Sequence, residues 1–138
     1  MKKGKYRFVE RDIPLYFGVL RIIIADDLQA ANDALELGDT AIQGGLGCYQ
    51  AVVWDVLVPC EQHTIYAMFR GRPDAQTLAH EAKHVVNRLF RARGVVLDLW
   101  HDEPECYMIG WVAKWIDFCA NSKEVKSKKY PKQKLKIN

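Results

Sequence analysis

Several features that would place this chain in a common class are missing from its sequence. Its 138 residues contain no apolar run long enough to cross a membrane, because Arg21 interrupts the apolar stretch at residues 19–25. The basic start at residues 1–5 is followed by charged and aromatic residues instead of the apolar core of a signal peptide. We therefore expect a cytoplasmic protein that has no membrane partner.

Cysteine is sparse, and its spacing excludes two further classes. No Cys-x-x-Cys pair is present, which excludes a zinc ribbon and argues against a small disulfide framework. Free, buried thiols in a reducing compartment are the expectation. The four cysteines are Cys48, Cys60, Cys106 and Cys119. The glycine-rich stretch at 38–47 lacks a Gly-Lys-Ser/Thr sequence, so it predicts a loop and excludes a phosphate-binding P-loop.

Acidic residues are scarce at the end of the chain. Residues 122–138 contain seven Lys and one Glu, whereas the whole chain carries a formal charge of +3. This shift in composition predicts a single folded domain over residues 1–120 and a Lys-rich, flexible C-terminal tail over residues 121–138. No recognised nucleic-acid motif accompanies the lysines, so the sequence does not favour a nucleic-acid partner.

Hydrophobic patterning indicates an α+β fold. Strands are predicted at residues 5–10, 15–25, 49–57 and 63–69, and helices at 26–37, at 73–94 and from 102 onward. The 73–94 helix has Asp74 at its start, Gly94 after its last turn and an apolar stripe between them. The strand at 63–69 alternates around Ile65, Ala67 and Phe69, which indicates one covered face, and it leads directly into this helix. The last two helices are predicted to pack together.

The most informative motif is His80-Glu81-Ala82-Lys83-His84. Two histidines four residues apart share one face of a helix, so both imidazoles can reach one metal ion. Glu81 is placed to accept a proton from a water that the metal activates. The motif predicts one Zn²⁺ per chain, with His80 and His84 as ligands and Glu81 as the catalytic base.

A catalytic zinc site needs a third protein ligand, and the sequence offers three candidates. Eighteen residues separate His84 from Glu103, a spacing typical of gluzincin-type peptidases, and Glu103 is the preferred ligand. Glu105 could instead close a capping box with Asp102, and His101 would give a site of three histidines. Asn87 and Asp98 are candidates to orient the histidines, and His63, His101 and Tyr107 to stabilise the transition state.

These segments resemble a known family. Residues 77–87, with Asp102-Glu103-Pro104 and then Cys106-Tyr107-Met108-Ile109-Gly110-Trp111, are similar to small metallopeptidases of tailed bacteriophages and prophages. The family pattern usually has Ala where this chain has Cys106, and Leu where it has Met108. The resemblance implies a minimal gluzincin fold, a protein or peptide substrate, and a location in the host cytoplasm or the virion. It also implies that the strand at 63–69 is an edge strand, which lies along the cleft and pairs with the substrate.

A second class of function fits the same residues. The chain could be a non-catalytic phage protein that keeps a zinc fold and binds another phage protein, a virion component or a host protein. A purely structural zinc site is usually closed by four protein ligands, and Cys106 is the obvious candidate for a fourth. The presence of Glu81 favours the enzyme, because a structural site has no use for a base.

Overall fold

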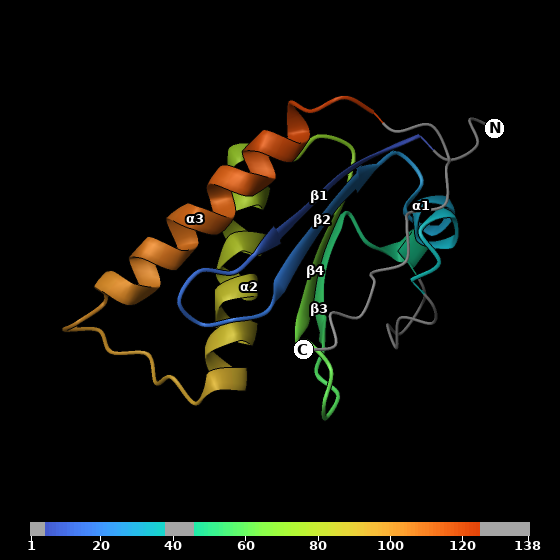
Figure 1. The fold of residues 1–138 in the computed structure, drawn as a ribbon. Coiled ribbons are helices and arrows are strands. Elements are labelled where there is room, and N and C mark those ends of the chain that lie inside the picture. Colours follow the sequence, from blue (N-terminus) through green and yellow to red (C-terminus); the bar gives the residue numbers. More distant parts are fainter. Residues whose placement is uncertain (1–4, 38–45, 125–138) are drawn as a thin grey trace.

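The computed structural model describes residues 5–37 and 46–124, and a four-stranded sheet in the order β1-β2-β4-β3 forms its middle layer (Figure 1). The strands are β1 (Tyr6–Asp12), β2 (Val19–Ala25), β3 (Ala51–Val56) and β4 (Thr64–Arg70). The helices are α1 (Leu28–Ala34), α2 (Ala75–Arg93) and α3 (Glu103–Ala120), with a short 3-10 turn, η1, at Leu46–Cys48. Most of the predicted glycine-rich loop, at 38–45, and of the predicted tail, at 125–138, lies outside the described residues.

Different helices cover the two faces of the sheet, with α2 and α3 on one face and α1 on the other (Figure 1). The side chains of β2 show the reason. Ile22 and Ile24 belong to the apolar cluster that includes α2 and α3, whereas Ile23, between them, belongs to the cluster that includes α1. Successive strand residues point to opposite faces, so a strand covered on both sides needs apolar residues at nearly every position.

The prediction that the strand before α2 lies at a sheet edge is wrong. β4 is an interior strand, paired parallel with β2 and antiparallel with β3. Alternation of Ile65, Ala67 and Phe69 indicated one covered face, but Tyr66 and Met68 are also buried, beneath α1. The edge strands are β1 and β3, and of these β3 lies beside α2.

The helix pair agrees with the sequence in type and position. The Asp74 side chain accepts a hydrogen bond from the Thr77 N–H at the start of α2, and Gly94 ends the helix with a φ of 67°. The Arg72 guanidinium, just before α2, donates to the Asn121 side chain just after α3, so the two packed helices run antiparallel. None of the helices in the described ranges is long and apolar enough to cross a membrane.

Candidate metal centre

The two histidines of the HExxH motif converge on the exposed side of α2. The Nε2 atoms of His80 and His84 lie 3.1 Å apart, and both side chains are exposed. Two imidazole nitrogens on one tetrahedral zinc would lie about 3.3 Å apart, given Zn–N bonds of about 2.0–2.1 Å. The pair therefore fits two corners of a zinc site without rearrangement of the helix.

Glu81 occupies a different environment from the histidines that flank it. Its residue is 7% exposed, and none of the described donors forms a hydrogen bond or an ion pair with its carboxylate. Although the residue is mostly buried, its oxygens are not among the fully buried polar atoms without a partner, so solvent still reaches the carboxylate. With no partner among the described residues, its lone pairs stay free for a proton, as a general base needs.

The third-ligand candidates all lie at or just before the start of α3, but none completes the site. Glu103 is the first residue of α3 and is exposed. The His101 side chain is paired with Asp98, and the Glu105 carboxylate with the Lys83 ammonium. Within residues 5–37 and 46–124, no three His, Cys, Asp or Glu side chains are grouped closely enough to hold a metal.

The Lys83–Glu105 ion pair links one of the third-ligand candidates to α2. It brings the first turn of α3 against the residue that precedes His84, and the Glu105 side chain is 16% exposed. The capping box proposed for Glu105 is wrong, because the Asp102 side chain makes no cap hydrogen bond and Glu105 binds Lys83 instead. An ion pair thus holds the Glu105 side chain against α2.

The residues that the sequence predicted to orient the histidines or to stabilise the transition state do not take up those positions. Asp98 accepts hydrogen bonds from the Trp100 N–H and the His101 ring, which lower the pKa of its carboxyl, so it does not orient the α2 histidines. Asn87 is exposed, and Tyr107 is 56% exposed on α3. His63 is buried in a separate network and faces no solvent.

Cys106 is a free, exposed thiol on the first turns of α3. Desolvation, and then the negative charges of Asp102, Glu103 and Glu105, raise the pKa of this thiol. Burial was predicted for all four cysteines, but only Cys119 is buried, and Cys48, Cys60 and Cys106 are exposed.

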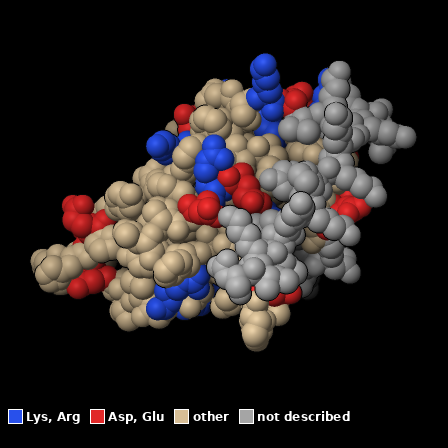
Figure 2. Space-filling view, in the orientation of Figure 1, with Lys and Arg blue, Asp and Glu red and all other residues tan. Residues whose placement is uncertain are grey.

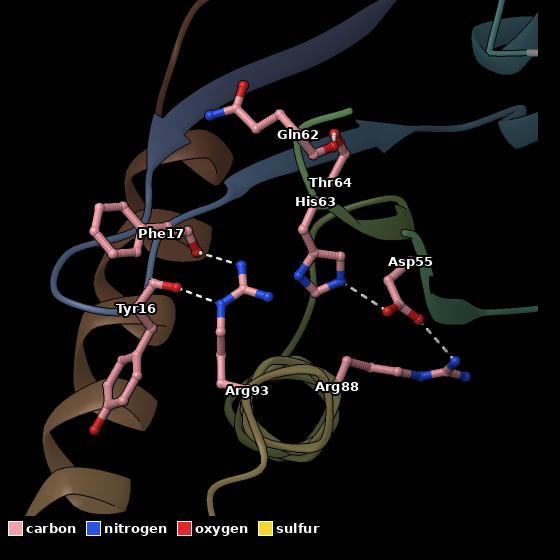
Figure 3. A network of polar contacts seen from close by, with 8 residues as sticks. All are labelled: Tyr16, Phe17, Asp55, Gln62, His63, Thr64, Arg88 and Arg93. Atoms are coloured by element: carbon pink, nitrogen blue, oxygen red, sulfur yellow. Dashed lines mark hydrogen bonds and ion pairs between the residues drawn. The ribbon is translucent and has the colours of Figure 1, made fainter. Parts of the chain in front are cut away.

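A buried polar network at the C-terminal half of α2 was not recognised from the sequence (Figure 3). The Asp55 carboxylate, on β3, lies 2.8 Å from His63 Nε2 and 3.0 Å from Arg88 Nη1. The His63 side chain is 1% exposed, and its Nδ1 has no hydrogen-bond partner among the described residues. The available signal was Asp55 itself, a lone acid within an otherwise apolar and aromatic strand.

Neither the family models, nor the curated proteins, nor the solved structures with which the chain was compared give a match. A function must therefore be argued from the α+β fold, the histidine pair and Glu81, whose carboxylate has no partner within residues 5–37 and 46–124.

Proposed function

We propose that this protein is a zinc-dependent peptidase. The observation that carries the proposal is the 3.1 Å approach of His80 Nε2 and His84 Nε2 on an exposed helix face. Glu81 directly follows His80, and its carboxylate has no partner among the described residues. An exposed pair of imidazoles leaves room for a substrate, which a closed structural site would not. The motif resemblance supports a phage-encoded enzyme that acts in the host cytoplasm or in the virion, on a protein or peptide.

In this proposal, some residues bind the metal and Glu81 transfers the proton. His80 and His84 hold the metal, and Glu103 is the proposed third ligand, with Glu105 as its rival because its side chain contacts α2 through Lys83. Zinc, when bound, supplies a Lewis acid that polarises the peptide carbonyl and acidifies water. Glu81 accepts the proton of the attacking water and delivers it to the leaving amine as the C–N bond breaks.

The non-catalytic alternative has one specific observation in its favour. The described residues assemble two ligands and not three, so α2 and α3 could serve as a scaffold for a virion or host partner. Closure of a structural zinc site by Cys106 would require this exposed thiol to turn toward α2 as a thiolate. Zinc-edge X-ray absorption distinguishes the two cases, because a Zn–S bond of about 2.3 Å differs from bonds to nitrogen and oxygen.

The experiment measures zinc per chain by elemental analysis in protein purified without added metal, together with hydrolysis of an unfolded protein substrate. We expect about one zinc per chain. His80→Ala and His84→Ala should lose the metal, whereas the matched control His101→Ala should keep it, because His101 is an exposed histidine paired with Asp98. Glu81→Gln should retain zinc and lose hydrolysis. Full hydrolysis by Glu81→Gln, or no zinc even after its addition, would refute the proposal.

Two further variants, with substitutions two positions apart in the chain, identify the third ligand. Glu103→Gln and Glu105→Gln each remove one charge from the first turn of α3. The true ligand should show a zinc affinity lowered by about tenfold or more, and the other variant should bind zinc as the unmodified protein does. Equal, undiminished affinity in both variants would remove α3 from the metal site.

A further inference from the structure

The link between α2 and α3 exposes large apolar side chains at one end of the molecule. Val96, Leu99 and Trp100 are 85%, 87% and 91% exposed. The link projects beyond the sheet and reaches the far left of the view (Figure 1). Isolated apolar residues are common on surfaces, but several consecutive ones indicate a site of interaction.

The charge of this link has a single sign. Residues 95–103, here named the acidic link, contain Asp98, Asp102 and Glu103 and no Lys or Arg. Acidic side chains flank the projecting apolar surface at the left of the space-filling view (Figure 2). A surface that is both apolar and acidic is complementary to a segment that carries apolar residues among positive charges.

The chain itself contains such a segment. Residues 125–138, here named the basic segment, contain six Lys and no Asp or Glu. They also include Val125, Tyr130, Leu135 and Ile137, and the last two are separated by one lysine. Alternation of lysine and aliphatic residues would let one side of an extended segment contact apolar side chains while the lysines meet carboxylates.

The basic segment is long enough to reach the acidic link. The 18 residues of α3 span about 27 Å, and the acidic link lies at the opposite end of this helix from residue 124. The basic segment, with its 14 residues, spans up to about 46 Å when extended. A tether this short gives an effective concentration of about 1 mM, so docking within one chain would prevail over docking between chains at micromolar concentration.

We propose that the basic segment docks on the acidic link of its own chain. Leu135 and Ile137 would cover Trp100 and its apolar neighbours, and the lysines would neutralise Asp98 and Asp102. This inference does not depend on the peptidase proposal, because the docking contacts are made by Trp100, Asp98 and Asp102, and Glu103 is not needed for them.

Acrylamide quenching of Trp100 fluorescence in the full chain tests the proposal. The other three tryptophans are partly buried, and a Trp100→Phe variant isolates the signal of Trp100. We expect shielding at about 0.02 M salt and release at about 0.5 M salt, because screening over a few ångströms abolishes contacts between exposed charges. Replacement of the six lysines by Ser, or Asp98→Asn with Asp102→Asn, should raise the quenching constant by about twofold.

Two controls make the outcome decisive. Asp12→Asn with Asp26→Asn removes two exposed acids elsewhere and should leave quenching unchanged. Asp98→Lys with Asp102→Lys should abolish shielding, and Lys→Glu substitutions in the basic segment should restore it. Equal quenching in the unmodified chain and in both neutralised variants would overturn the proposal. Shielding that grows with protein concentration would overturn it too, because it would indicate docking between chains.

Discussion

The Asp55 network gives a stability prediction whose size can be worked out from the structure. Asp55 accepts hydrogen bonds from His63 Nε2 at 2.8 Å and from Arg88 Nη1 at 3.0 Å (Figure 3). It thus joins β3 to α2 and to the residue just before β4. A carboxylate accepts but does not donate, so Nε2 of His63 carries the hydrogen of this bond. Because Nδ1 has no partner within the described residues, Asp55 makes the one hydrogen bond of this buried ring.

Asp55→Ala should therefore leave the whole imidazole unpaired in the interior. Loss of a buried hydrogen bond to a charged group costs about 1.5–3 kcal/mol. The Arg88 contact adds about 0–1 kcal/mol, discounted because that side chain is 38% exposed. We expect a total loss of about 2–4 kcal/mol, which lowers Tm by about 10 °C in a domain of this size.

Urea and thermal unfolding followed by circular dichroism measure this loss. Arg88→Ala is the matched control, because it removes the exposed partner and keeps the His63–Asp55 hydrogen bond; it should cost at most about 1 kcal/mol. The loss of unfolding free energy in Asp55→Asn should lie between the losses in Asp55→Ala and Arg88→Ala. Its amide oxygen can still accept a hydrogen bond from His63, whereas its amide nitrogen cannot accept one from Arg88. If Asp55→Ala costs no more than Arg88→Ala, the buried hydrogen bond does not stabilise the fold as argued.

Two further predictions follow from burial and from helix capping. Cys119 is buried, and desolvation raises the pKa of its thiol to about 12. A thiol reagent at neutral pH should therefore react with Cys119 only after unfolding. In the folded protein it should label the three exposed cysteines, Cys48, Cys60 and Cys106. Labelling of Cys119 at the rate of the others would contradict its position in the core. The hydrogen bond from the Thr77 N–H lowers the pKa of the Asp74 carboxyl in the folded state. The Asp74 cap therefore stabilises the fold fully above the unfolded-state pKa of about 3.9, and this contribution is lost as the pH falls through the lower, folded-state pKa. Asp74→Asn, which keeps a capping side chain without a titrating group, should flatten the fall in stability below about pH 4; an unchanged acid profile would show that the cap does not contribute.

Much of the fold could be predicted from local patterns. The α2 helix was bounded by Asp74 and Gly94 because capping depends on residues within one turn of the helix end. The strands and α3 followed in the same way from apolar periodicity. The place of β4 inside the sheet was missed, because strand order depends on pairing with β2, whose partner residues lie about 45 positions earlier in the chain.

For the candidate site, the sequence by itself determined that His80 and His84 share one side of a helix, since four residues make slightly more than one turn. It also placed Glu103 and Glu105 in the first turn of the next helix. Only the tertiary structure decided that Glu105 meets Lys83 and that Asp55 joins His63 to Arg88. These contacts depend on how α2, α3 and the sheet pack in three dimensions, and spacing along the chain carries no information about that packing.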